Sequence, residues 1–380
     1  MKKILLIISV LSILVFSGCA KSLIKLVLIK DPDPHKMFGK NSAREFYNPI
    51  IISDSLKEIW ESDVFGGFTN NSVINNDSII FVGDLGGRIH CFNVETGKQI
   101  GVLKSKGSVY STPLIINTKI IYALVDQKED LTELIFYDMY IGKELEILEI
   151  NGRVLSQMLL DKEDIILCTE NGLVKKYSET GNLLWEFDTK SKLYANPAML
   201  DNNLLVANDK GEIISLNAKT GNQNYKVKIG VSFFSGITIE KHFGYVADNK
   251  GVIYSFNIND GKIIWNYETS ARIMMNIALD EQNLYAGNLN GDLYAIDKVF
   301  GKLTWKSELG GSFNSTPLIT KNRIVISNLF KKFTFIDKLN GNVVKDFELD
   351  GRCRLSPIIV KNKLIIGYDD GVLRAYEFIY

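Results

Sequence analysis

Few residue types that could perform chemistry are present, and they are scattered along the chain. The 380 residues include three widely separated histidines, His35, His90 and His242. The four cysteines are Cys19, Cys91, Cys168 and Cys353. They form no CxxC pair, no CxxCH haem-attachment motif and no zinc-type spacing. These residues therefore predict neither a metal site nor covalently attached haem.

Carboxylates are the other candidates for acid–base chemistry or metal binding. The most suggestive of them stand in predicted turns: Asp84, Asp209, Asp248, Asp369 and Asp370. They recur at equivalent places in a repeated pattern, and turn aspartates commonly accept backbone N–H groups. We interpret them as turn residues. With no persuasive catalytic base or metal cluster, the sequence predicts a protein without enzymatic activity and without a cofactor.

The overall charge also limits the function. The chain has 44 basic and 44 acidic residues, so its formal net charge is zero. A dedicated nucleic-acid binder would usually show a basic excess or stripe. Nucleic acid is therefore not an expected partner.

A repeat positions all these residues. Residues 294–305 read YAIDKVFGKLTW, in which Gly301 precedes Trp305 by four residues. Equivalent glycines are Gly97, Gly142, Gly181, Gly221, Gly261, Gly301 and Gly341. The first two spacings are 45 and 39 residues, and the remaining four are 40. A fixed period in this range indicates a repeat architecture.

Each repeat reads as four short antiparallel strands, the pattern of a β-propeller blade. In residues 272–311, Asn290 and Gly291 give a two-residue hairpin signal between apolar runs. Trp185, Trp265 and Trp305 recur at one place, which favours packing between blades over ligand stacking. We predict an all-β, eight-bladed propeller of four-stranded blades over residues 51–380, with seven blades as the alternative.

The ends of the repeat predict how the ring closes. Trp60 stands one period before the repeated aromatic column, so residues 57–61 read as a fourth strand without its own blade. Residues 354–380 supply three strands and lack a fourth. We expect the N- and C-terminal strands to pair, which removes exposed sheet edges.

The N-terminus resembles a bacterial lipoprotein signal. Lys2 and Lys3 precede an apolar run at residues 4–16, which is too short to span a membrane. The run ends in FSGC, and the resemblance implies that Cys19 is lipidated. The alternative is an ordinary signal peptide with a chance cysteine. We expect a signal peptide at residues 1–18 and a lipid-anchored tether at 19–50. The apolar stretch at 22–29 either lies against the membrane or packs on the domain. Ala20 favours the outer membrane, by resemblance to the usual sorting rule.

The pattern A-x-D-x-x-x-G-x-x-x-W resembles the tryptophan-docking repeat of quinoprotein-like propellers. That resemblance covers nearly the whole mature chain and implies the fold. Two groups with this fold differ in function. Quinoprotein dehydrogenases bind pyrroloquinoline quinone and calcium, and they are longer chains with insertions that build the site. The present chain keeps a nearly strict period, and no two of its cysteines are adjacent.

In layout the chain is similar to the B-component lipoproteins of the outer-membrane β-barrel assembly machinery. This resemblance implies a scaffold at the periplasmic face of the outer membrane, monomeric within a complex. It implies binding to the POTRA domains of the barrel-forming subunit, and unfolded outer-membrane proteins are possible further partners. The alternatives are a quinone-dependent dehydrogenase, or a subunit serving one, and a periplasmic ligand-binding propeller.

The same resemblance implies that two loops bind the partner, residues 188–194 (DTKSKLY) and 229–235 (IGVSFFS). The expected contact residues are Lys192, Leu193, Tyr194, Phe233 and Phe234. The first loop lacks the family's arginine, and the second has phenylalanines where the family has aspartates. Phe233 and Phe234 are either an exposed anchor or buried in the channel mouth.

Overall fold

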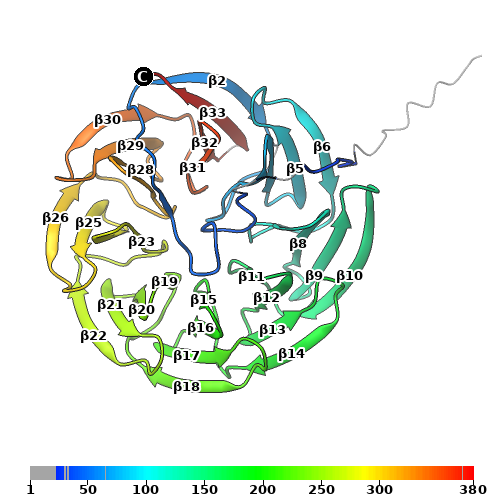
Figure 1. Ribbon diagram of the computed structural model, residues 1–380, viewed down its shortest axis with the longest axis horizontal. Helices are drawn as coiled ribbons and strands as arrows, with labels where there is room; N and C mark the ends of the chain where they lie inside the picture. Colours follow the sequence, from blue (N-terminus) through cyan, green and yellow to red (C-terminus); the bar gives the residue numbers. More distant parts are fainter. Residues whose placement is uncertain (1–22, 30, 32–33, 65, 370) are drawn as a thin grey trace, which may run out of the picture.

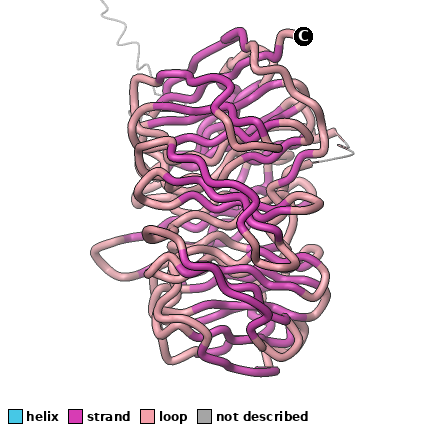
Figure 2. Tube along the Cα trace, turned by 90° about the vertical axis from the view of Figure 1, so that its left-hand side faces the viewer, coloured by secondary structure: helices cyan, strands magenta, loops and turns pink. Residues whose placement is uncertain are grey.

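The computed structural model describes residues 23–29, 31, 34–64, 66–369 and 371–380. Eight sheets are arranged in a closed ring around a central channel (Figure 1), and all the regular secondary structure in the described part is strand. Figure 2 shows the ring from its edge as a thick disc of strands joined by short loops. The predicted eight-bladed propeller is confirmed. The described residues contain no helix long and apolar enough to cross a membrane.

Each blade is built from four strands that lie side by side from the channel outward. The first blade has β3 (Ile74–Asn76), β4 (Ile79–Gly83), β5 (Arg88–Asn93) and β6 (Gln99–Lys104). The second has β7 (Leu114–Ile116), β8 (Lys119–Asp126), β9 (Leu131–Asp138) and β10 (Lys143–Asn151). The third has β11 (Leu159–Asp161), β12 (Asp164–Cys168), β13 (Leu173–Tyr177) and β14 (Leu183–Asp188). The fourth has β15 (Ala198–Leu200), β16 (Asn203–Ala207), β17 (Glu212–Asn217) and β18 (Gln223–Lys228).

The other four blades follow the same order. The fifth has β19 (Thr238–Glu240), β20 (Phe243–Ala247), β21 (Val252–Asn257) and β22 (Ile263–Glu268). The sixth has β23 (Ala278–Leu279), β24 (Asn283–Gly287), β25 (Asp292–Asp297) and β26 (Leu303–Glu308). The seventh has β27 (Leu318–Thr320), β28 (Arg323–Ser327), β29 (Lys332–Asp337) and β30 (Val343–Glu348). The eighth has β31 (Ile358–Val360), β32 (Lys363–Tyr368), β33 (Val372–Phe378) and β2 (Leu56–Asp63).

The ring closes where β2 pairs with β33, as predicted. This antiparallel pairing runs from Leu56 opposite Phe378 to Asp63 opposite Val372. The eighth blade therefore takes its outermost strand from the N-terminal part of the chain. Closure leaves the eighth blade with a complete sheet and ties both ends of the propeller together.

Antiparallel strand order gives the ring two different faces. Loops that join one blade to the next lie on one face, together with the turns between second and third strands; we call it the rim face. Turns between first and second strands, and between third and fourth strands, lie on the opposite face, which we call the turn face. This division follows from the strand order in each sheet.

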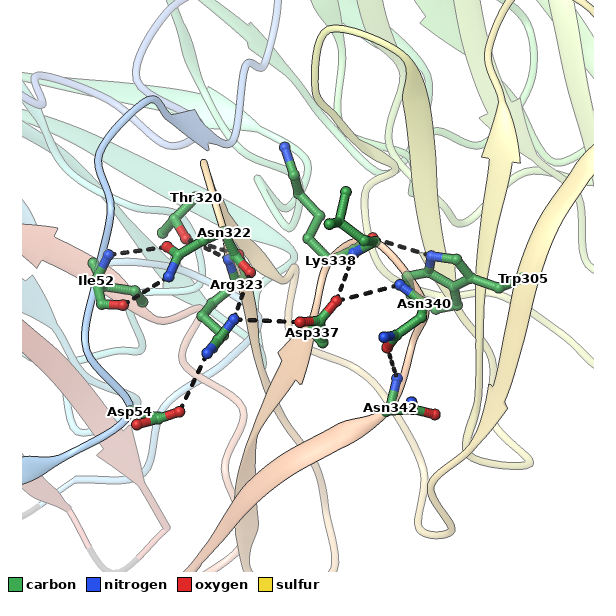
Figure 3. Close-up of polar contacts among 11 residues, drawn as sticks. Ile52, Asp54, Trp305, Thr320, Asn322, Arg323, Asp337, Lys338, Asn340 and Asn342 are labelled. Carbon is green, nitrogen blue, oxygen red and sulfur yellow. Dashed lines mark hydrogen bonds and ion pairs between the residues drawn. The ribbon is translucent and has the colours of Figure 1, made fainter.

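The repeated tryptophans pack between blades, as predicted. Trp305 of β26 donates its indole N–H to the backbone carbonyl of Lys338 in the next blade, at 3.1 Å (Figure 3). Trp265 makes the equivalent bond to Lys298, also at 3.1 Å. A Cβ added to Gly301, whose φ is +68°, would lie 2.6 Å from the ring of Trp265. The glycine is therefore required both by its backbone conformation and by the neighbouring indole.

Residues 34–50 lie in the channel and on its inner wall, in a range that we expected to be a tether. Five backbone carbonyls of this segment accept N–H groups from the first strands of five blades. The pairs are His35 with Asn75, Lys36 with Ile115, Ser42 with Met199, Ala43 with Ile239, and Phe46 with Ile319. Figure 1 shows the segment as a dark blue loop reaching the middle of the ring. The short strand β1 (Tyr47–Asn48) adds in parallel to β27.

Arg44 fixes this segment to the wall. Its guanidinium is fully buried and donates to the carbonyl oxygens of Phe38, Gln157, Met158 and Pro197, at 2.7–3.0 Å. Burial lowers the pKa of Arg44 to about 9, so the side chain stays charged at neutral pH. Inner-strand edges offer unpaired backbone groups, and the segment satisfies part of them. Residues 34–50 thus belong structurally to the propeller.

The segment ahead of it packs on the outer edge of the first two blades. Leu26 donates its N–H to the carbonyl of Met139 at 2.7 Å, and Tyr137 donates its hydroxyl to the carbonyl of Ile24 at 2.9 Å. Ile24 is fully buried. Of the two expectations for residues 22–29, packing on the domain describes the residues from 23 onward. Cys19 and the predicted signal peptide lie outside the described residues.

Candidate functional site: a collar at the channel mouth

One position in every inter-blade loop surrounds the rim-face end of the channel. Each of these eight residues is half-buried and follows a fully or almost fully buried neighbour. We call the eight residues the collar: Thr69, Tyr110, Leu155, Tyr194, Phe234, Met274, Asn314 and Arg354. The buried neighbours are Phe68, Val109, Val154, Leu193, Phe233, Ile273, Phe313 and Cys353. The repeat therefore places one residue inward and the next toward the channel mouth.

This alternation decides where the predicted contact residues lie. Leu193 and Phe233 are 1% and 0% exposed and belong to the cores of their blades. Lys192 is exposed, whereas Tyr194 and Phe234 are half-buried members of the collar. We had expected the phenylalanine pair to be either an exposed anchor or buried, and the two residues differ in this respect. Phe233 is buried, and Phe234 faces the channel mouth.

Tyr194 and Phe234 form a continuous aromatic surface between two blades. Their ring centroids are 4.9 Å apart and their planes differ by 13°, which is a stacked arrangement. Phe233 is held beneath by an edge-to-face contact with Tyr254, with centroids 6.3 Å apart. Stacked aromatic pairs of this kind contribute roughly 0.5–1.5 kcal/mol beyond area burial. The loops of the fourth and fifth blades are therefore joined into one surface.

A charged cluster borders this aromatic surface. Glu170, in a rim-face turn of the third blade, accepts a hydrogen bond from the Tyr194 hydroxyl at 2.9 Å and lies 3.6 Å from the Lys192 ammonium. Arg153 from the preceding inter-blade loop forms an ion pair with Glu170 and a longer one with Asp130. Burial alone would raise the pKa of Glu170. Hydrogen bonds from Tyr194 and Arg153, with the charges of Arg153 and Lys192, outweigh burial and lower that pKa.

The collar differs between its two halves. Five consecutive blades contribute large, mainly apolar side chains, Tyr110, Leu155, Tyr194, Phe234 and Met274. The next three contribute Asn314, Arg354 and Thr69. A hollow of about 730 Å³ lies at the channel mouth. Its lining combines polar residues (Asn314, Arg354, Arg352 and Asp369) with Tyr110 and Leu155 of the apolar blades. The mouth therefore has an apolar half, on the second to sixth blades, and a polar half.

The polar half does not suit a calcium-bound quinone. A hard cation needs several oxygen ligands, whereas Asp369 is the one carboxylate among the described residues that line the hollow. It is paired with Arg352 at 2.9 Å and lies 3.8 Å from Arg354. In the described part of the chain, no group of three or more His, Cys, Asp and Glu residues could hold a metal ion. We therefore derive no chemistry through a quinone or a metal at this mouth.

The three cysteines in the described range are buried and unpaired. Burial raises the pKa of the Cys168 and Cys353 thiols to about 12, and burial also raises that of Cys91. The thiolate, which is the reactive form, is therefore strongly disfavoured at neutral pH. These residues behave as small core side chains.

Sequence reasoning missed Arg153 and Glu170. The expected loop lacked an arginine, but Arg153 stands one repeat before Lys192 and extends toward the same carboxylate. Aligning the inter-blade loops by the 39- and 40-residue spacings would have paired these two cations. Such an alignment would also have shown that Leu193 and Phe233 share one position of the repeat, and Tyr194 and Phe234 the next.

Comparisons with known proteins agree with the class that the fold defines, an eight-bladed propeller of quinoprotein-like repeats. A family model described as outer membrane protein assembly factor BamB matches residues 170–278 and 268–378, more than half of the chain. The chain belongs to this BamB family.

Two solved structures illustrate how widely the fold is shared. BamB from Moraxella catarrhalis is 15% identical, with a TM-score of 0.74, over 85% of this chain and 100% of that one. Quinohemoprotein alcohol dehydrogenase from Comamonas testosteroni is 12% identical, with a TM-score of 0.76, over 91% of this chain and 80% of that one. At such identities the likeness concerns the fold alone.

One curated relative is an enzyme. Tetrathionate hydrolase from Acidithiobacillus ferrooxidans is 34% identical over 73 residues, which is 19% of this chain and 15% of that enzyme. The match is about two repeats long. It covers too little of the enzyme to carry over its activity.

Proposed function

We propose that this protein is a non-enzymatic scaffold of outer-membrane protein assembly. In this proposal it is a lipoprotein, anchored through Cys19 at the periplasmic face of the outer membrane. It binds the POTRA domains of the barrel-forming subunit through the rim face. Membership of the BamB family is the observation that carries the proposal.

The apolar half of the collar supports this function. Tyr194 and Phe234 form a stacked surface with Lys192, Arg153 and Glu170 beside it. Aromatic residues and arginine are enriched in the cores of protein interfaces. The surface spans two inter-blade loops that are fixed to well-packed blades, so little ordering entropy is lost when a partner binds. Leu193 and Phe233 support the surface from inside.

Co-purification tests the proposal directly. A tagged form of the full chain is extracted from membranes with mild detergent, and the bound proteins are identified by mass spectrometry. We expect the barrel-forming subunit in amounts comparable to the bait. A variant with Tyr194→Ala and Phe234→Ala should lose most of it. Recovery of unrelated enzymes alone would overturn the proposal.

A ligand-binding or quinone-dependent role is the second candidate, because the channel mouth contains a hollow with two arginines. The quinohemoprotein dehydrogenases of similar fold also motivate it. Addition of pyrroloquinoline quinone and calcium to the purified protein checks this role. A shift of the quinone absorbance, or dye reduction with an alcohol, would favour it. We expect neither, because the carboxylate that such a cation needs is already paired with Arg352.

A further inference from the structure

We propose that the turn face docks on a phospholipid surface through an arc of apolar side chains on the sixth, seventh, eighth and second blades. This inference deepens the proposed function, because it assumes that the protein works at a membrane. It assigns membrane contact to a second surface, opposite to the collar. It thereby defines the orientation of the ring relative to the membrane.

The tips of three turns between third and fourth strands carry the arc. Tyr140 and Ile141 in the second blade, Phe300 in the sixth and Leu339 in the seventh are strongly exposed, with 71% for Phe300 and 83% for Leu339. In the eighth blade the position equivalent to Phe300 is taken by Tyr380, whose ring is exposed and whose hydroxyl donates to the carbonyl of Ile51 at 3.2 Å. A large apolar side chain at a turn tip has no packing role within its own blade. Several of them on one face mark an interaction surface.

The corresponding turns of the first, third, fourth and fifth blades are polar, so the first blade separates the apolar tips of the eighth and second blades. The polar tip residues are Glu95, Thr96, Glu179, Thr180, Lys219, Thr220, Asn259 and Asp260. Asp260 stands where the next blade has Phe300, and Asn259 stands where the seventh blade has Leu339. The backbone is the same in these turns, since each glycine that follows has a positive φ near 70–90°. The apolar tips are therefore a property of particular blades and do not follow from the repeat.

The rim face lacks such an arc. Its exposed large apolar residues in the described chain are Val231 and Phe330. The turn face has the apolar tips of the arc, and the adjoining segment adds Val27 and Ile29, which are 76% and 59% exposed. The two faces therefore differ strongly in the apolar surface that they offer to solvent.

The N-terminal chain indicates that lipid is the occupant. Residues 23–29 enter at the outer edge of the first two blades, and Leu26 is bonded to the turn that carries Tyr140. Twenty-two residues precede this segment, including the apolar run at 4–16 and Cys19. A chain attached to a membrane through this region brings the neighbouring apolar tips within reach of the same membrane.

Lysines flank the apolar tips. Lys143 follows Ile141 by two residues, Lys302 follows Phe300 by two residues, and both are exposed. Lys262 holds the equivalent place in the polar turn of the fifth blade, so it is the combination of lysine with an apolar tip that distinguishes these two turns. Lysine next to exposed apolar side chains suits the boundary between acyl chains and anionic headgroups. Lipid contact at the arc would leave the third to fifth blades farthest from the membrane. The aromatic surface of Tyr194 and Phe234 lies on the opposite face among these blades, where it is free for a partner.

Fluorescent labels on matched turns test the arc. The full chain is reconstituted with vesicles of phosphatidylethanolamine and phosphatidylglycerol, with and without brominated acyl chains that quench nearby fluorophores. Phe300→Cys and Leu339→Cys carry the label in turn, and Asp260→Cys and Asn259→Cys are the matched controls. The native cysteines of the described chain are buried, and unsubstituted protein treated in the same way gives the background.

We expect severalfold stronger quenching at positions 300 and 339 than at 260 and 259. Equal quenching at all four positions, or none at any, would overturn the proposal, because the ring would then be held by its N-terminus alone. Quenching that requires an added protein partner would also overturn it. These vesicles contain no assembly subunit, so loss of partner binding in the co-purification experiment is a separate failure.

A second variant removes the dependence on labelling. Phe300→Asp combined with Leu339→Asp should reduce the fraction of protein that floats with vesicles severalfold. In the control turn of the fifth blade, Asp260 already carries this charge. An Asn259→Asp variant adds it at the second control position and serves as the matched control. Both variants change exposed turn tips, so their unfolding midpoints should stay close to wild type. Unchanged flotation would contradict the arc.

Discussion

The two halves of the collar share one backbone and differ in chemistry. Tyr194 and Phe234 stack in the apolar half, whereas Asn314 and Arg354 hold equivalent positions in the polar half. In both halves the preceding residue is buried in its blade. The repeat thus determines which residues are buried and leaves the channel-facing position free to vary. A function that depends on partner recognition is therefore expected to depend on that second position.

The largest expected effect is a difference in stability between alanine variants of Phe233 and Phe234. Phe233→Ala should lower the free energy of unfolding by about 3–5 kcal/mol, because the side chain is fully buried and leaves a cavity. Phe234→Ala should cost less than about 1.5 kcal/mol, mainly from the lost stacking with Tyr194. Denaturant unfolding followed by tryptophan fluorescence measures both. Equal losses would contradict the division into buried and channel-facing positions.

The next effect concerns Arg44, which fixes residues 34–50 to the inner wall of the channel. Arg44→Met removes the donor for four backbone carbonyls, and we expect a loss of about 2–4 kcal/mol of stability. The variant should also become sensitive to limited proteolysis within residues 34–50. Glu45→Ala, an exposed neighbour, is the matched control and should behave like wild type. If residues 34–50 stay protected from proteolysis in the Arg44 variant, their backbone hydrogen bonds to the first strands are enough to hold them, and the role given to Arg44 is contradicted.

A smaller effect concerns the charged border of the aromatic surface. Glu170→Gln should lower stability by about 1 kcal/mol at neutral pH, because the ion pair with Arg153 is lost. The folded state lowers the pKa of Glu170 from its ordinary value of 4.5. Its contribution is therefore complete above that pH and disappears as the pH falls through the lowered value.

Unfolding of the wild type and of the Glu170→Gln variant across this pH range checks the sign. The two curves should converge in acid. A difference that grows as the pH falls would mean that the carboxyl is stabilised in its protonated form.

Much of the fold could be predicted from the period of the sequence. The spacing of Gly301 and Trp305, repeated along the chain, predicted the blades, and Trp60 predicted the closure through β2. Residues 34–50 were not recognised as part of the ring, because their contacts are backbone bonds to strands far away in sequence. Such pairing leaves no periodic pattern. Arg44 was the one available signal, since a buried arginine needs acceptors, but burial cannot be read from an irregular segment.

The candidate site was predicted less completely. The two loops and five residues were expected to contact the partner, and burial of the phenylalanine pair was left open. Leu193 and Phe233 are buried. Hydrophobicity alone cannot distinguish Phe233 from Phe234, because adjacent residues of one type differ only in the direction that the backbone gives them. Glu170 and Arg153 come from neighbouring turns, and their meeting depends on how blades sit beside one another.

The central claim is that the apolar half of the collar binds a protein partner. Titration of the purified POTRA domains with the full chain measures this most directly. Combined Tyr194→Ala and Phe234→Ala substitutions should raise the dissociation constant by about tenfold or more. A tenfold rise corresponds to a loss of about 1.4 kcal/mol of binding free energy. Asn314→Ala in the polar half should leave it within about twofold. Equal affinity of all three proteins, or an effect confined to Asn314→Ala, would contradict the account.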